Sequence, residues 1–280
     1  MLAKLRELGK VGVITDVPAY ELPPNAFTAA NNIRFNDGTL SRAPMPVTLE
    51  SDIIDARWIQ PLVVDDVASY AYATKDTLYF SSNNITSDLS NPSGHTSSDY
   101  WQSVVWGESV IMNNGIDVPQ IKRPQDATFI DLPNWPSNWR CKVIRRYKSF
   151  LIALGVSKAG VLLESHVVWS TEAADDDIPH TWDETDTTAL AGYNPVSSSV
   201  GLWVDCLPLG DANILYARSE VWQMQFTGGQ EVFSFTRLFS GGLLGSDAVC
   251  EINNAHFVVS PDSIYTHNGI EPMHFLDDRN

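Results

Sequence analysis

The sequence predicts an all-β fold, built from β-propeller-like blades of antiparallel hairpins with long loops and an extended N-terminal arm. First, short apolar or aromatic runs recur in pairs around tight polar turns. Second, the later run of a pair alternates apolar and polar residues, as in Val221–Phe226, which is the period of a strand with one buried face. Third, only 19% of the 280 residues are charged, and residues typical of turns replace them.

The first 46 residues are predicted to form an arm rather than a blade. Leu2, Leu5 and Leu8 recur every three residues, which is the spacing of one or two helical turns. Residues 16–46 are rich in Pro and Asn, and Pro24–Asn32 is a short helical possibility. We expect the rest of the arm to be extended and to dock on neighbouring subunits.

Five hairpins are predicted after the arm. They pair Ser69–Thr74 with Thr77–Ser81, Ser103–Trp106 with Ser109–Met112, Phe150–Leu154 with His166–Ser170, Ile214–Ala217 with Val221–Phe226, and His256–Ser260 with Ser263–His267. Each would supply half of a four-stranded blade, which favours a propeller over a two-sheet sandwich. Residues 47–280 are therefore expected to form the propeller-like domain, incomplete at its C-terminal end because no closing blade follows the last predicted strand.

Two long segments interrupt this series of hairpins. Asn83–Tyr100 and Thr171–Ser199 contain few apolar runs and many polar residues. Loops of this length are usually functional or form interfaces. We expect both segments to be irregular and to make contacts between subunits.

The formal net charge is -16, from 34 Asp and Glu against 18 Lys and Arg. This balance excludes a basic protein that coats nucleic acid. One basic run is the exception, and it comprises Arg140, Lys142, Arg145, Arg146 and Lys148. On a single strand, all of these except Arg145 would share one face, from which they could contact DNA phosphates. The alternative is an interface of ion pairs with acidic loops of the same or a neighbouring chain.

No catalytic, cofactor-binding or metal site is predicted, and the protein is not expected to be an enzyme. The acidic run Asp175, Asp176 and Asp177 is a weak candidate for Ca²⁺, because consecutive aspartates cannot all turn toward one ion. A solvated or intersubunit loop is the favoured interpretation of this run. The sequence contains no GxSxG or HExxH motif, and the glycine-rich segment 240–246 lacks the lysine of a phosphate-binding loop.

Nine tryptophans allow two interpretations. They could form a platform for carbohydrate, or they could fill the space between blades or between subunits as large apolar side chains. The second use is the commoner one. The three cysteines, Cys141, Cys206 and Cys250, have no CxxC spacing and are expected to be free thiols. The charged N-terminus lacks the apolar core of a signal peptide, so we expect no export by that route.

The opening stretch 12–44 has a Gly12-Val-Ile start, a Gly38-Thr-Leu turn and an Arg42-Ala-Pro end. Further characteristic segments are Arg146–Gly155, Val168–Glu172 and Ile214–Met224. In content and in order, these segments resemble the nozzle family of short-tailed bacteriophages (podophages), also called tail tubular protein B or tail hub.

The resemblance implies a structural virion protein of the phage tail, assembled in the host cytoplasm without a membrane anchor. Its subunits would form a ring, a hexamer in this family, that extends the DNA ejection channel and links the adaptor ring to a tail fibre or tip protein. Viral double-stranded DNA would pass through, and an acidic wall would keep the duplex from sticking. Residues of the arm expected to dock on neighbouring subunits are Pro18, Pro23, Pro24, Arg34, Arg42 and Pro44. A receptor-binding, glycan-binding or glycan-hydrolysing propeller is the alternative.

Overall fold

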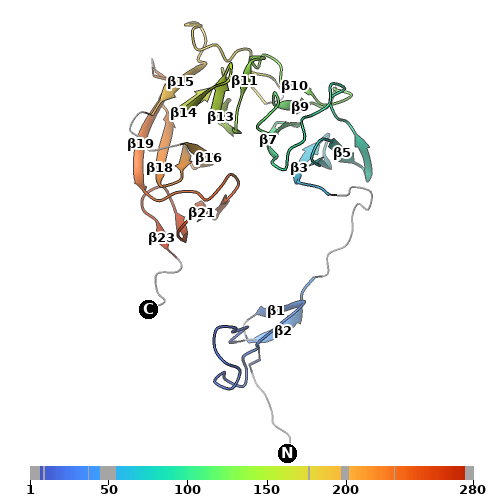
Figure 1. Ribbon diagram of the computed structural model, residues 1–280, viewed down its shortest axis with the longest axis vertical. Coiled ribbons are helices and arrows are strands. Elements are labelled where there is room, and N and C mark those ends of the chain that lie inside the picture. Colours follow the sequence, from blue (N-terminus) through green and yellow to red (C-terminus); the bar gives the residue numbers. More distant parts are fainter. Residues whose placement is uncertain are drawn as a thin grey trace, which may run out of the picture. The chain divides into compact units, whose positions relative to one another are not determined.

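The computed structural model describes residues 7–8, 10–36, 38–44, 55–175, 177–196, 202–229 and 231–274, and these residues contain strands and loops but no helix. The chain divides into two compact units, Met1–Ile53 and Ile54–Asn280. Figure 1 shows the first unit in blue and the second from cyan to red. The division falls C-terminal to the boundary that the sequence predicts after residue 46.

The N-terminal unit contains one antiparallel hairpin, β1 (Ile33–Asn36) and β2 (Thr39–Arg42). A parallel bridge joins Val13 to Phe27, and the Phe27 amide donates to the Gly12 carbonyl at 2.9 Å. The predicted helix at Pro24–Asn32 is wrong, because this pairing holds the backbone around Phe27 extended. Leu2 and Leu5 of the first helical prediction lie outside the described residues.

The described residues of the second unit form a series of five antiparallel sheets, each from one continuous piece of the chain. Blade 1 comprises β3 (Trp58–Val64), β4 (Val67–Ala73), β5 (Leu78–Ser82) and β6 (Ile85–Asp88). Blade 2 comprises β7 (Gln102–Trp106), β8 (Ser109–Asn113), β9 (Gln120–Lys122) and β10 (Ile130–Asp131). Blade 3 comprises β11 (Trp139–Arg140), β12 (Val143–Tyr147), β13 (Phe150–Lys158), β14 (Val161–Trp169) and β15 (Gly192–Pro195).

The remaining two sheets repeat the same four-stranded order. Blade 4 comprises β16 (Trp203–Leu209), β17 (Ala212–Ala217), β18 (Glu220–Phe226) and β19 (Phe233–Ser240). Blade 5 comprises β20 (Val249–Ile252), β21 (Ala255–Val259), β22 (Ile264–His267) and β23 (Met273–His274). All five predicted hairpins are confirmed, one in each blade. The prediction that Asn83–Tyr100 and Thr171–Ser199 are wholly irregular is wrong, because β6 and β15 complete their blades there.

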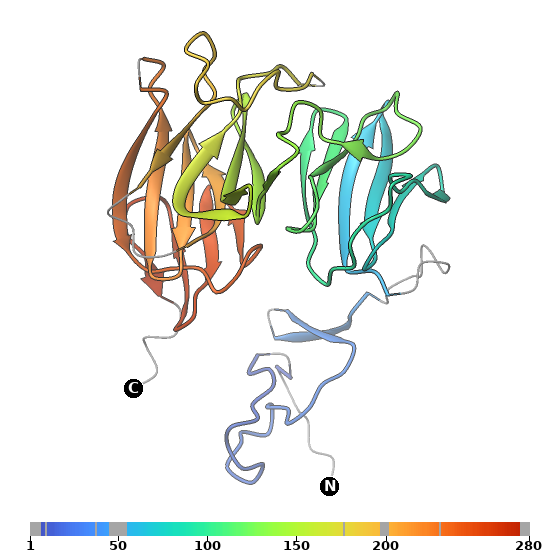
Figure 2. The same cartoon turned by 45° about the horizontal axis from the view of Figure 1, so that its top comes forward.

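The blades follow one another around an arc, which is the arrangement of a β-propeller (Figures 1 and 2). Contacts connect the first strands of successive blades, from β3 to β7, then to β12, β16 and β20. These strands therefore line the axis of the propeller. The predicted fold class is confirmed: the protein is all-β and is built from propeller blades of antiparallel hairpins.

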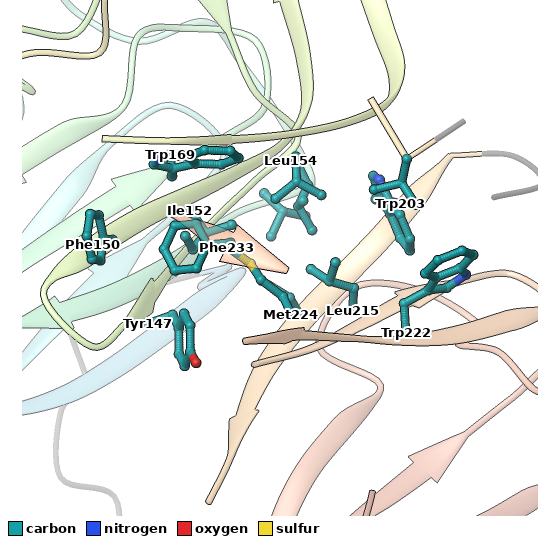
Figure 3. Close-up of a cluster of buried hydrophobic side chains, with 14 of the residues drawn as sticks. Tyr147, Phe150, Ile152, Leu154, Trp169, Trp203, Leu215, Trp222, Met224 and Phe233 are labelled. Carbon is teal, nitrogen blue, oxygen red and sulfur yellow. The ribbon is translucent and has the colours of Figure 1, made fainter. Parts of the chain in front are cut away.

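Large apolar side chains fill the spaces between blades. The cluster between blades 3 and 4 contains Ile152, Leu154, Trp169, Trp203 and Trp222 (Figure 3). On β13 the alternate residues, such as Leu151 and Ala153, belong to the cluster on the blade 2 side. This strand is buried on both faces, which explains why its sequence is a continuous apolar run rather than an alternating one.

Blade 5 is attached to blade 4 by a buried chain of hydrogen bonds through Tyr216. Its hydroxyl lies 2.7 Å from His256 Nδ1 and 2.6 Å from His267 Nε2. His256 Nε2 lies 2.9 Å from the Pro208 carbonyl, so this nitrogen donates and Nδ1 accepts the Tyr216 proton. The Gly269 amide donates to His267 Nδ1 at 3.1 Å, so His267 Nε2–H donates to Tyr216. Each donor and acceptor in this chain of hydrogen bonds has a partner only when both His256 and His267 are neutral.

Acidification is expected to weaken this attachment. Burial lowers the pKa of His267 to about 4, and His256 beside it acts in the same direction. The unfolded chain binds the proton near pH 6.5, so the stabilisation is present above about pH 6.5 and is lost as the pH falls through about 4. Urea unfolding measured between pH 8 and 4 should show this fall in the free energy of unfolding.

The matched variant is His267→Gln, which keeps a donor toward Tyr216 and does not titrate. Carboxylates elsewhere also titrate at low pH, so the informative quantity is the difference between wild type and variant. We expect the difference in the free energy of unfolding between wild type and His267→Gln to shrink steadily below pH 6.5. Parallel pH profiles for the two proteins would contradict the assigned tautomers.

Candidate functional site

The predicted basic residues do not lie on one strand. The first strand of blade 3 is interrupted between β11 and β12, and both pieces pair with β13. Lys142 lies at the interruption, opposite Gly155, which has a φ of 58°. A Cβ at Gly155 would lie 2.8 Å from Lys142 Cγ. Glycine therefore permits the interruption, and the single basic face expected from strand periodicity is wrong.

Arg145 lies at the centre of the site and connects three blades. Its Nε and Nη2 donate to the two carboxylate oxygens of Asp205 on β16, each at 2.8 Å. Its Nη1 donates to the Ser103 carbonyl on β7 at 3.0 Å, and Nη2 also pairs with Asp247 in the segment that leads to blade 5. Burial opposes the charge of Arg145, but Asp205 and Asp247 outweigh it and raise its pKa.

Asp205 is almost fully buried, with 1% of its surface exposed. Besides the guanidinium, its carboxylate accepts hydrogen bonds from the backbone amides of Cys206 and Asp247, both at 2.8 Å. A carboxylate with this number of donors is fully compensated despite its burial. Burial raises the pKa of Asp247, although Arg145 acts in the opposite direction.

Arg146 and Lys148 are also paired with aspartates of the same chain. Arg146 pairs with Asp175, and its guanidinium lies over the Trp106 ring at 4.9 Å from the centroid. Lys148 pairs with Asp211 at the β16–β17 turn. The structure thus gives three of the five predicted basic residues an acidic partner. That they contact DNA or another subunit remains a prediction.

These three side chains line a cavity of about 590 Å³ at the axis of the propeller. Its walls come from the first strands of blades 1 to 4, and from Lys148 and Ser149 after β12. The lining residues are Gln60, Ser103, Val104, Val105, Arg145, Arg146, Lys148, Ser149, Leu207 and Pro208. Because the cations are paired, the cavity is a pocket of balanced charge rather than a strongly positive one.

Arg140 and Lys142 do not line this cavity. The Arg140 guanidinium donates to the carbonyls of Ile116, Ser137 and Trp139, at 2.8, 2.8 and 2.6 Å. The side chain of Lys142 is exposed, and its carbonyl accepts from Asn113 Nδ2 at 3.2 Å. Both residues therefore connect blade 3 to the end of β8 and the loop that follows it.

The residues of the acidic run after β14 make separate contacts within the chain. Asp175 pairs with Arg146, whereas the Asp177 carbonyl accepts the Trp106 indole N–H at 2.8 Å. Asp176 lies outside the described residues. Within the described ranges, no group of three or more His, Cys, Asp or Glu could hold a metal ion. Nor does any described segment form a helix long and apolar enough to cross a membrane.

The residues predicted to dock on neighbours are all on the surface of the N-terminal unit. Pro18 and Pro23 begin tight turns, in which their carbonyls accept the amides of Glu21 and Ala26 at 2.9 Å. Pro24 follows in the second turn, and Pro44 follows β2. Arg34 lies on β1 and Arg42 on β2. Docking through these residues stays a prediction.

Sequence reasoning missed Asp205, the central acidic residue of the site. The feature of the sequence that indicates Asp205 is its position in Trp203–Leu209, where it is the single charged residue in an otherwise apolar strand. A lone carboxylate in a buried strand requires a cationic partner. Arg145 could have been matched to it only with knowledge of how blades 3 and 4 stack.

Comparison with known proteins identifies no family model and no curated protein that matches the chain. Solved structures do match in fold. One is a chain from a structural and mechanistic analysis of two prolyl endopeptidases, with 12% sequence identity and a TM-score of 0.46. The match covers 86% of this chain and 37% of that chain, so this chain spans little more than a third of its length.

The replacement Arg145→Met is expected to lower the free energy of unfolding by about 3–5 kcal/mol, because it leaves the carboxylate of Asp205 buried and unpaired. Chemical denaturation at pH 7 measures the loss. The exposed ion pair between Lys148 and Asp211 provides the control, because Lys148→Ala should lower the free energy of unfolding by less than about 1 kcal/mol. Equal losses in the two variants would show that the Arg145 pair does not hold the blades together.

Proposed function

We propose that this protein is a structural subunit of a phage tail, a member of the nozzle ring that extends the DNA ejection channel of a short-tailed bacteriophage. In this proposal the subunits form a closed homo-oligomeric ring, a hexamer, between the adaptor ring and a fibre or tip protein. The protein works in the virion by assembly and by letting DNA pass, and it catalyses no reaction.

The observation that carries the proposal is the apolar surface on the two terminal blades. Ile59 and Val63 of β3 alternate with buried Leu62, so they lie on the face of blade 1 that is turned away from blade 2. Ile252 and Met273 lie on blade 5, and both are more than half exposed. Exposed apolar residues on the faces of terminal blades are typical of surfaces that another protein covers. A ring subunit needs such surfaces.

The charge distribution also supports a conduit. Six copies of a chain with net charge -16 would place on the order of a hundred negative charges around the DNA path. Three cations of the basic run, Arg145, Arg146 and Lys148, are engaged by Asp205, Asp175 and Asp211, so they are not free to bind phosphates. Weak attraction suits a wall past which a duplex must slide.

Sedimentation velocity and electron microscopy of the purified full chain test this proposal. We expect ring-shaped oligomers with an axial opening. The variant Ile59→Asp should dissociate them, because it places a charge within an apolar contact. Val161→Asp is the matched control, because Val161 is 66% exposed but lies at the tip of the β13–β14 hairpin.

Circular dichroism and thermal melting should show both variants folded. A wild-type protein that stays monomeric at high concentration, or rings that Ile59→Asp leaves intact, would contradict the assembly. Binding to polysaccharide with turnover, in place of ring formation, would instead favour the glycan-hydrolysing alternative.

A further inference from the structure

A second, larger cavity lies between the outer parts of blades 3 and 4. Its volume is about 990 Å³, which is in the range of ligand sites. One wall is formed by β15 and the loop before it, and the other by β19 with Gly229, Glu231 and Val232 before it. We call this cavity the β15–β19 groove.

The floor of the groove is aromatic and rigid. Phe233 is 3% exposed and packs against Trp169, with ring centroids 5.1 Å apart, and Phe235 is partly buried beside them. The Trp169 indole donates to the Leu190 carbonyl at 2.7 Å, and this hydrogen bond fixes the loop before β15. Gly192 lies so close to this indole that a Cβ there would be 2.8 Å from the ring. The groove is therefore held in its shape before any ligand arrives.

The rim of the groove is acidic. It carries Glu184, Asp186 and Glu231. Glu184 pairs with Lys158, but no salt bridge among the described residues involves Asp186 or Glu231. Hydrogen bonds from the Thr188 hydroxyl and amide lower the pKa of Asp186. The carboxylates of Asp186 and Glu231 thus remain available to a cationic ligand.

The two walls end in sheet edges. Within the described part of the chain, β15 pairs with β14 alone and β19 with β18 alone, so each presents unpaired backbone groups on its outer side. The groove is lined by Gly192, Tyr193 and Asn194 from one edge and by Phe233, Ser234 and Phe235 from the other. An extended strand is the kind of ligand that uses such edges, by β-augmentation.

We propose that the β15–β19 groove binds an extended segment of a partner protein in which basic and apolar residues alternate. The segment adds as a strand to one of the two edges. Its apolar side chains lie on Tyr193 and Phe235, and its Lys or Arg side chains face Asp186 and Glu231. Alternation follows from the strand geometry, because successive side chains point to opposite faces. This inference is independent of the proposed nozzle function.

Fluorescence anisotropy with the full chain tests the proposal. The probes are two labelled heptapeptides, one of alternating valine and lysine and one of alternating valine and glutamate. We expect the lysine peptide to bind at least about tenfold more tightly, with an affinity that falls as salt is raised. Glu231→Lys should weaken its binding about tenfold, whereas Glu251→Lys on exposed β20 should leave the affinity unchanged.

A third probe distinguishes strand addition from simple charge attraction. Methylation of alternate backbone nitrogens of the lysine peptide removes the hydrogen bonds of one strand edge but keeps every charge, so binding should be lost. Equal binding of the lysine and glutamate peptides, equal effects of Glu231→Lys and Glu251→Lys, or full binding of the methylated peptide would each overturn the proposal. Ring formation is measured separately and does not enter these outcomes.

Discussion

The buried ion pair between Arg145 and Asp205 is the interaction on which the arrangement of the blades depends. A carboxylate that is 1% exposed is very costly without its partner, so the first strands of blades 3 and 4 can stack in only one register. The same guanidinium donates to Ser103 on blade 2 and pairs with Asp247 before blade 5. One side chain thus fixes four consecutive parts of the propeller around its axis.

Apolar packing between blades provides most of the remaining stabilisation. The apolar side chains that it leaves exposed bear on function. Each internal space between blades is filled by large side chains, including Trp106, Trp169 and Trp203. Most of the tryptophans therefore fill interblade space rather than form an exposed carbohydrate platform. The outer faces of the first and fifth blades bear apolar residues as well, but these are exposed. Apolar side chains are thus exposed on both the first and the fifth blade.

The cationic side chains of the basic run form ion pairs within the chain. Arg145, Arg146 and Lys148 are each matched by an aspartate from another part of the chain. Acidic side chains are in excess, and some of them, such as Asp186 and Glu231, remain on the surface near an apolar floor. An acidic protein of this kind attracts basic partners and repels polyanions. Both properties are compatible with the proposed role in a phage tail.

The sequence by itself determined the all-β class and the five hairpins, because strand periodicity and tight turns are local properties that neighbouring residues specify. It did not determine β6 and β15, the outermost strands, because their edge positions require little apolar patterning. Only the tertiary structure decided the role of the basic residues. Gly155 permits the interruption that divides them between two strands, and blade stacking brings Asp205 to Arg145 from 60 positions along the chain. Contacts of that range depend on how sheets pack, which no local pattern encodes.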